Sequence, residues 1–239
     1  MHHPSQQEEE RLVRDFFAGK QSGFFVEVGA NHPTERSQTW HLEQAGWTGV
    51  LIEPQPDLAA ILVAARRAKV FAVACTAPQL AGESLPLHVD GACSALDRDR
   101  MAPGSRVASV ILVPTRTLDD VLEEAEAPAP LDLLSIDVEG HETEVLQGFD
   151  FFGWRPRLIL VEDHVGSLRT HRVLTGHGYR LARRLGNNGW YVPIGSGMKV
   201  TASERWSIVR KYYLALPFRV ARNTSRRVRR LLSDWWTGR

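Results

Sequence analysis

Short apolar runs alternate with helical patterns along the first third of the chain. Segments 37–46 and 56–67 have apolar residues at helical spacing, and Gly46 provides a C-cap for the first of them. The apolar runs around them are expected to form buried strands, at 23–30, 49–54 and 69–75. Strands and helices in alternation predict a parallel sheet with helices packed on its faces.

The second half of the chain resumes this pattern after an interruption. Residues 76–115 are rich in Gly, Pro and Ser, and we expect an insertion that contains a small β element. Two further core strands are expected at 131–137 and 157–163, with a helix over 142–149 between them. Two strands around Asn187-Asn188-Gly189 then form a predicted hairpin. The pattern predicts one α/β domain over 1–202, with its core at about 22–192.

Charge is distributed unevenly between this domain and the tail at 203–239. Residues 205–239 contain ten Lys or Arg and one acid, Asp234, out of 29 basic and 28 acidic residues in the whole chain. An acidic body with a basic tail suggests that the tail meets a polyanion or an anionic membrane.

A helical wheel separates the tail residues into two faces. One face carries apolar residues and Thr224, namely Val220, Thr224, Val228, Leu231 and Trp235, and the other carries Arg219, Arg222, Arg226, Arg229 and Arg230. This division, with Trp235-Trp236 near the end, is typical of an amphipathic helix in a membrane interface. We therefore expect an anionic membrane surface as the partner of 203–239. The alternatives are packing on the body or on a second copy of the chain, while a nucleic acid is disfavoured because the body offers no matching basic surface.

The first residues, which are acidic, lack the apolar region of a secretory signal, and the longest apolar run, 58–65, is too short to cross a membrane. Cys75 and Cys93 have no metal-ligand spacing and are expected to be buried reduced thiols. We therefore expect a cytoplasmic protein, peripheral on the inner face of a membrane.

Polar side chains follow four of the predicted strands at their carboxyl ends. They are Glu27 and Asn31, then Glu53, then Asp137, Glu139, His141 and Glu142, and finally Glu162, Asp163 and His164. Helix capping explains any one of them but not all four strand ends together. Because open parallel sheets bind ligands outside the carboxyl ends of their strands, we expect a ligand site here.

Glu53 indicates what kind of ligand this site holds. It lies about 24 residues after Gly29, where a carboxylate can accept both hydroxyls of a ribose. The turn at Gly29-Ala30-Asn31 lacks the G-x-G-x-x-G pattern that places a pyrophosphate on a helix N-terminus, which argues against NAD or FAD. A nucleoside without a diphosphate, such as S-adenosyl-L-methionine (SAM), fits better.

Five segments together resemble the FkbM family of SAM-dependent O-methyltransferases. They are FFVEVGAN, GVLIEPQPD, FAVAC, VPTRTLDDVL and LDLLSIDVEGHETEVLQGF, and the resemblance covers about residues 22–192. It implies a class I SAM-dependent methyltransferase (Rossmann-like) fold: a mostly parallel seven-stranded sheet with helices on both faces and one antiparallel strand near the edge. The C-terminal amphipathic helices would be added to that fold.

The resemblance also implies roles for individual residues. Glu27, Gly29, Ala30 and Asn31 would form the methionine side of the SAM site, Glu53 and Pro54 the ribose side, and Ala74 and Cys75 the adenine side. Asp137 would face the methyl sulfonium, and Glu139 and Glu142 the acceptor. The chain departs from the family pattern at Glu27, where Asp is usual, and at His32-Pro33, which replaces a second glycine.

Methyl transfer to a hydroxyl needs alignment and a group that takes the proton. Asp137 is the first candidate base, followed by His141 and His164; alternatively, Asp137 with Glu162 or Asp163 could hold Mg²⁺. The expected reaction is O-methylation, first of a sugar hydroxyl in a glycan or glycolipid. A small natural product such as a polyketide is the alternative acceptor, and a non-catalytic SAM-binding adaptor is the alternative class of function, suggested by the altered loop at His32-Pro33.

Overall fold

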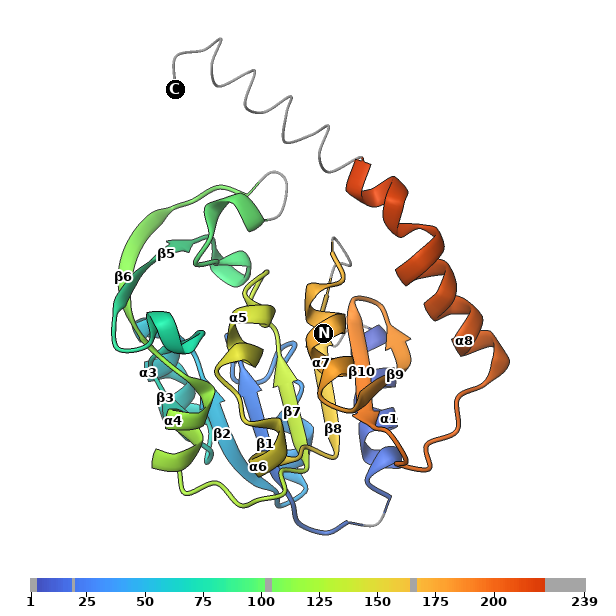
Figure 1. Cartoon of the computed structure of the whole chain (residues 1–239). Helices are drawn as coiled ribbons and strands as arrows, with labels where there is room; N and C mark the ends of the chain where they lie inside the picture. The colour runs from blue at the N-terminus through green and yellow to red at the C-terminus, as the bar shows by residue number, and fades with distance from the viewer. Residues whose placement is uncertain (1–3, 19, 102–104, 164–166, 222–239) are drawn as a thin grey trace.

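The computed structural model describes residues 4–18, 20–101, 105–163 and 167–221 (Figure 1). Its main element is a seven-stranded sheet in the order β3-β2-β1-β7-β8-β10-β9. The strands are β1 (Phe24–Val28), β2 (Thr48–Ile52), β3 (Lys69–Phe71), β7 (Leu133–Ile136), β8 (Leu158–Glu162), β9 (Tyr179–Leu185) and β10 (Asn188–Pro193). Strand β10 runs antiparallel to both of its neighbours, β8 and β9, and the other strand pairs of this sheet are parallel. The predicted class I methyltransferase architecture, with its antiparallel strand near the edge, is confirmed.

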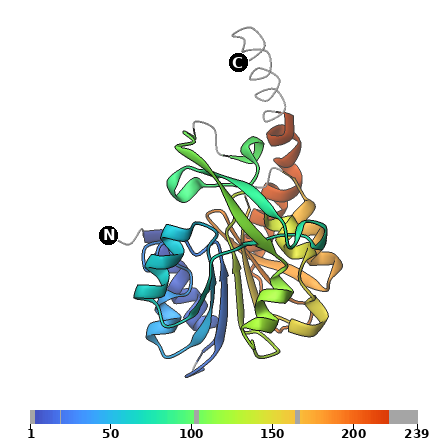
Figure 2. The ribbon, with the colours of Figure 1, turned by 90° about the vertical axis from the view of Figure 1, so that its left-hand side faces the viewer.

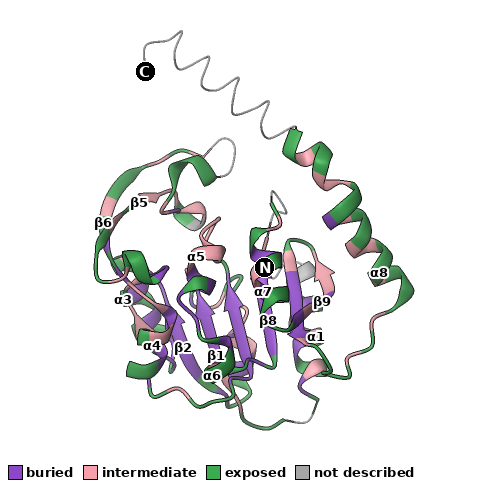
Figure 3. Cartoon of the chain, viewed as in Figure 1, coloured by how far each residue is buried: buried purple, intermediate pink, exposed green. Residues whose placement is uncertain are grey.

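Helices cover both faces of this sheet, and each strand contributes to both apolar layers. In β1, Val26 and Val28 join the layer that contains α4 (Leu118–Glu124), α5 (Glu142–Gln147) and α7 (Arg169–Gly176). Phe25 points to the opposite layer, with residues of α1 (Pro4–Phe16), α2 (Trp40–Gln44) and α3 (Pro56–Ala65). A two-residue period between two covered faces explains why the core strands are apolar runs rather than alternating ones. Figure 3 shows the buried strands at the centre of the molecule.

The insertion forms a second, smaller sheet with the order β4-β6-β5. Strand β5 (Ser84–Val89) pairs antiparallel with β6 (Ser109–Arg116), as the expected β element requires. The expected single strand at 69–75 is wrong, because β3 ends at Phe71 and β4 (Ala74–Cys75) pairs with β6 instead. This change of partner leads the chain from the main sheet into the small sheet. Figure 2 shows the small sheet above one end of the main sheet.

The first part of the tail packs on the edge of the main sheet. Helix α8 (Ala202–Val209) continues as a π-helical turn, η4 (Arg210–Leu214), and residues 216–221 are helical again. Glu204 of α8 pairs with Arg183 of β9 at 2.6 Å, and Tyr212 is fully buried. Packing on the body, one of the alternatives, therefore holds for this part. The predicted amphipathic face from Arg222 onward lies outside the described residues. No helix in the part of the chain that the structure describes is long and apolar enough to span a membrane.

Candidate functional site

A cavity of about 850 Å³ lies at the carboxyl ends of β1, β2, β7 and β8. Its walls also include residues of the insertion, of α1 and of the turn between β9 and β10. Eleven of the expected site residues line it: Gly29, Ala30, Asn31, Glu53, Pro54, Ala74, Cys75, Asp137, Glu139, His141 and Glu162. Glu27, Glu142 and Asp163 lie outside the lining, and His164 is outside the described residues.

The turn after β1 approaches the end of β7 so closely that only glycine fits. Gly29 has φ +84°, and a Cβ built there would lie 1.8 Å from the carbonyl oxygen of Asp137. The backbone N–H groups of Gly29 and Ala30 both donate to the Ile52 carbonyl, at 2.9 and 3.1 Å. The turn is thus held between β7 and β2, and its backbone forms part of the cavity wall.

Glu53 is a buried carboxylate held by the backbone on both sides. Its two oxygens accept N–H hydrogen bonds from Asn31 and Gln55, each at 2.9 Å. Burial raises the pKa of Glu53, and these two backbone hydrogen bonds act against that rise. The side chain is therefore fixed at the cavity wall in one orientation. Since a carboxylate offers about four acceptor sites, it keeps capacity for ligand hydroxyls.

Glu27 lies behind the wall and fastens the loop that follows the turn. Its carboxylate accepts hydrogen bonds from the hydroxyls of Ser37 and Thr39, at 2.9 and 2.5 Å, and from the Gln38 N–H at 2.7 Å. Burial raises its pKa, and the hydrogen bond from Thr39 is the largest opposing effect. The geometry gives Glu27 a positioning role for this loop; the expected contact with the cofactor stays a prediction.

Arg66 completes the support of this loop, a role that was not predicted from the sequence. Its guanidinium donates to the Pro33 carbonyl at 3.0 Å and to Thr39 Oγ1 at 3.0 Å, and it pairs with Glu43 at 3.1 Å. Both charged partners are almost fully buried. An interaction of this kind joins residues 23 to 33 positions apart, so no local pattern reveals it.

The His32-Pro33 sequence forms a turn of its own in place of the second glycine. His32 Nδ1 accepts the N–H groups of Thr34 and Glu35, at 3.2 and 2.9 Å. The Pro33 carbonyl accepts a hydrogen bond from Arg66. Proline has no backbone N–H, and the hydrogen bonds of this turn do not use one at Pro33. The altered loop is thus held by hydrogen bonds beside an open cavity, and the non-catalytic adaptor stays an alternative prediction.

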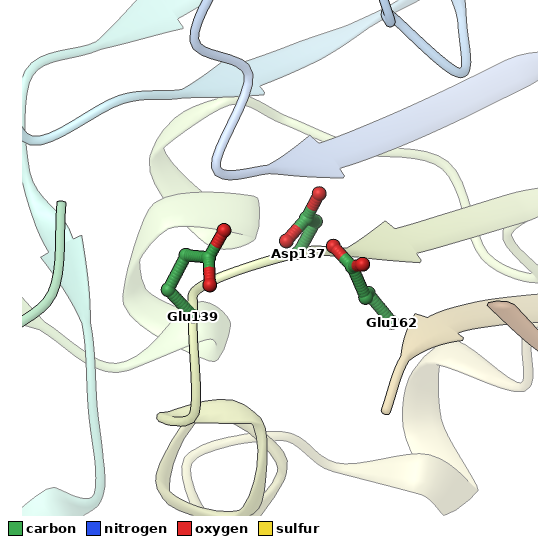
Figure 4. A group of neighbouring side chains, drawn as sticks. All are labelled: Asp137, Glu139 and Glu162. Carbon is green, nitrogen blue, oxygen red and sulfur yellow. The ribbon is translucent and has the colours of Figure 1, made fainter. Parts of the chain in front are cut away.

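Three carboxyl groups meet at the ends of β7 and β8 (Figure 4). Asp137, Glu139 and Glu162 point toward one another, and each offers an oxygen within 4.8 Å of the others. The cavity leaves Asp137 accessible, yet protein surrounds it. Removal from bulk water raises its pKa well above the usual range, and a hydrogen bond and like charge from Glu162 raise it further. Burial and the neighbouring carboxyl group of Glu162 therefore both favour the protonated form of Asp137.

The other candidates of this loop have protein partners. His141 Nε2 lies 3.0 Å from the Thr76 hydroxyl, which ties the loop to the insertion, and burial lowers the His141 pKa. Glu142 accepts the Gly140 N–H at 2.8 Å, and burial raises its pKa to about 7. Asp163 receives a hydrogen bond from Tyr212 of the tail at 3.4 Å.

Helix α1 contributes a wall residue that was not predicted, Glu9. Its carboxylate accepts hydrogen bonds from Trp190 Nε1 at 2.9 Å, Asn188 Nδ2 at 2.6 Å and Gln38 Nε2 at 3.2 Å. Burial raises its pKa. A single acid in an acidic helix gives no signal in the sequence, because its partners lie up to 181 positions away.

The two cysteines differ in their surroundings. Both thiols are free; Cys75 is buried, and burial raises its pKa to about 12, so it lines the cavity as a neutral group. Cys93 is only half-buried, which corrects the expectation of two buried thiols.

Residues 27–181 match the methyltransferase FkbM domain. The chain belongs to the FkbM methyltransferase family. It is therefore a SAM-dependent methyltransferase, as the five sequence segments suggested. No curated protein matches the chain.

Two solved structures are similar in fold to this FkbM methyltransferase. TrmK from M. capricolum, in complex with S-adenosyl-homocysteine, matches over 84% of this chain and 72% of that one, with 9% identity and a TM-score of 0.42. A precorrin-6y C5,15-methyltransferase from Geobacter metallireducens GS-15 matches over 80% and 91%, with 12% identity and a TM-score of 0.39. With TM-scores and identities this low, neither match supports a conclusion about this chain.

Glu142 should make the stability of the protein depend on pH. Its folded pKa of about 7 exceeds its ordinary value of 4.5, so the folded state binds more protons between these values. The free energy of unfolding should therefore fall as pH rises through this window. Glu142→Gln should remove that contribution and stabilise the protein by about 3 kcal/mol at pH 8, with little effect at pH 4.5.

Urea unfolding at both pH values measures this difference. The control is Glu123→Gln, which neutralises an exposed acid on α4 and should leave the pH dependence unchanged. If the free energy of unfolding changed equally between the two pH values in Glu142→Gln and in the unmodified protein, the raised pKa of Glu142 would be contradicted.

Proposed function

We propose that this FkbM methyltransferase transfers the methyl group of SAM to a hydroxyl of a sugar. The observation that carries the proposal is the carboxyl pair Asp137–Glu162, which faces the same cavity as the fixed Glu53. The Glu53 carboxylate is held in place to accept ligand hydroxyls, and burial together with the neighbouring Glu162 raises the pKa of Asp137. A proton acceptor beside a cofactor pocket is what methyl transfer to an alcohol requires.

The lining residues divide the cavity into parts for the cofactor and for the acceptor. Gly29, Ala30 and Asn31 would bind the methionine end of SAM through the backbone, Glu53 and Pro54 the ribose, and Ala74 and Cys75 the adenine. When bound, SAM supplies an electrophilic methyl group. The neutral Cys75 thiol suits the uncharged adenine ring better than a thiolate would.

Asp137 would take the proton of the acceptor hydroxyl as the oxygen attacks the methyl carbon. The new oxygen–carbon bond would replace the carbon–sulfur bond of SAM, in line with it, and the proton would pass to the ionised carboxylate of Asp137. A raised pKa makes the ionised form of Asp137 a stronger base near neutral pH than an ordinary aspartate. Glu162 is a positioning residue in this scheme, since it acts through Asp137.

His141 has a different role in this proposal. Its Nε2 faces Thr76, and its Nδ1 lies 3.8 Å from Glu144, so both ring nitrogens face groups of the protein. We therefore assign it the task of joining the insertion to the loop after β7. The base role of His164 stays a prediction.

The charge of the lining favours a neutral acceptor. Among the described residues, the lining contains seven carboxylic side chains, Glu8, Glu9, Glu35, Glu53, Asp137, Glu139 and Glu162, and one arginine, Arg36. Such a surface disfavours an acceptor molecule with net negative charge and offers many hydrogen-bond acceptors to hydroxyls. Sugar hydroxyls meet both conditions, whereas a polyketide offers fewer groups to use these acceptors.

Titration calorimetry with SAM tests the cofactor site. Glu53→Ala should weaken binding about a hundredfold, because two hydrogen bonds between the carboxylate and ribose hydroxyls are lost. Glu35→Ala removes another acid of the lining and is the control; it should stay within about threefold of the unmodified protein. Similar losses in both variants would mean that overall charge, and not the position of Glu53, determines binding.

Transfer of a labelled methyl group from SAM to neutral methyl glycosides tests the base. Asp137→Asn should abolish transfer while SAM still binds. Glu162→Gln should retain part of the activity and move the acid limb of the kcat/KM profile to lower pH, because it removes the neighbouring charge that raises the pKa of Asp137. An unchanged pH profile in Glu162→Gln would refute the carboxyl pair.

Treatment with EDTA tests the metal alternative. The three carboxyl groups are oxygen donors of the kind that Mg²⁺ prefers, but a cation has to compete with a proton on Asp137, whose pKa is raised. Asp163, the remaining expected ligand, is directed to Tyr212. Activity should be the same with and without EDTA. Loss of activity with EDTA and recovery with Mg²⁺ would replace the proposed base by a metal site.

A further inference from the structure

Four cationic side chains meet where the tail joins the sheet edge. They are Arg184 of β9, Arg210 and Lys211 of η4, and Arg219, and we call them the junction cluster. Burial lowers the pKa of Lys211, and the charges of Arg184, Arg219 and Arg210 lower it further, in that order. Asp163 faces the same region through the Tyr212 hydroxyl, at 3.4 Å. One acid against four cations leaves a net positive charge at the junction.

Several donors of the junction cluster lack an acceptor. Arg219 Nε and Nη2 are withdrawn from solvent without a hydrogen-bond partner among the described residues, and so is Arg184 Nε. The remaining nitrogens of Arg184 donate to the Tyr212 hydroxyl at 2.8 Å and to the Asp163 carbonyl. Unsatisfied guanidinium donors are costly, and at this position they leave positive charge that no hydrogen bond offsets.

The junction cluster lies beside the rim of the cavity. Lys211 Nζ donates to the Gly186 carbonyl at 3.3 Å, and Gly186 lines the cavity together with Leu185 and Asn187. An anion held by the cluster would therefore sit next to the entrance and outside the acidic interior. The junction cluster would thus hold a negatively charged group outside the acidic cavity in which the proposed reaction takes place.

The same segment of the tail exposes large apolar side chains. Trp206, Tyr213 and Leu214 are 61%, 53% and 53% exposed, and Phe218 is 79% exposed. Tyr212 between them is fully buried and ties the segment to the body. Figure 1 shows this segment rising along the edge of the sheet and beyond it, and its outer side is exposed in Figure 3. Aromatic and aliphatic side chains next to cations are typical of a surface that lies in a membrane interface.

We infer that the junction cluster binds phosphate headgroups of an anionic bilayer while Trp206, Tyr213, Leu214 and Phe218 enter the interface. Charge complementarity with the four cations selects an anionic headgroup, and the exposed apolar side chains select a bilayer over a free phosphate. This docking places the cavity rim at the membrane. It does not depend on the proposed reaction, but it would present a sugar of a membrane-held acceptor to the cavity.

Sedimentation of the full chain with vesicles tests this inference. Vesicles of phosphatidylcholine with 30% phosphatidylglycerol should bind the protein, and pure phosphatidylcholine should bind it weakly. Lys211→Gln/Arg219→Gln should lower the partition coefficient about thirtyfold, which corresponds to about 1 kcal/mol for each charge. Trp206→Ser/Phe218→Ser should also lower it, on both kinds of vesicle.

A control variant removes the same charge elsewhere. Arg11→Gln/Arg157→Gln changes two exposed arginines of the body and should leave partitioning within about twofold. Equal losses in both double variants would overturn the inference, since overall charge would then explain binding. Circular dichroism and SAM titration of each variant show whether it is folded, so loss of vesicle binding with normal SAM binding separates this docking from the proposed reaction.

Two further outcomes would also overturn it. Lys211→Gln/Arg219→Gln could abolish stabilisation by inorganic phosphate in thermal unfolding but leave vesicle binding unchanged; the cluster would then be a site for a soluble anion. Binding to a single-stranded DNA 20-mer without binding to vesicles would make a nucleic acid the partner.

Discussion

The contact between Gly29 and the carbonyl of Asp137 determines the geometry of the whole site. Strands β1 and β7 lie side by side with Val28 opposite Ile136, and the chain leaves both strands at this level. The Asp137 N–H donates to the Val28 carbonyl at 2.9 Å, while the Gly29 backbone lies against the Asp137 carbonyl. Any side chain at position 29 would separate the two loops. The width of the cavity and the position of Asp137 beside the turn after β1 both follow from this close contact between Gly29 and the Asp137 carbonyl.

The acidity of the cavity is a cost to stability that the ligand can offset. Burial raises the pKa values of Glu9, Glu53 and Asp137, so the folded protein holds these groups against their preference for water. Backbone N–H groups fix Glu53, and the raised pKa of Asp137 favours its neutral form. The positive sulfonium and ammonium groups of SAM would supply positive charge opposite these acids. Buried acids with raised pKa values are therefore consistent with a cofactor site.

The sequence revealed those features that depend on neighbouring residues, and missed those that depend on distant ones. The apolar runs ending in acids located Glu53 and Asp137 correctly, because a strand and its polar end are local. The split of 69–75 was missed, since apolarity does not tell which of two sheets a strand joins. Arg66 and Glu9 were missed for a related reason. Each is buried by partners from other elements, so its role exists only in the folded chain.

The acidic cavity and the cationic junction cluster lie next to each other. Lys211 of the cluster donates to the carbonyl of Gly186, and Gly186 lines the cavity. An acceptor with an anionic group could not place that group among seven carboxylic side chains, but it could leave it at the cluster while a neutral part enters. The tail carries the cationic charge, and Tyr212 fixes the tail at the rim. The uneven charge of the sequence thus becomes a spatial order in the fold: cations at the rim, acids inside, and the carboxyl groups of Asp137, Glu139 and Glu162 together at the strand ends.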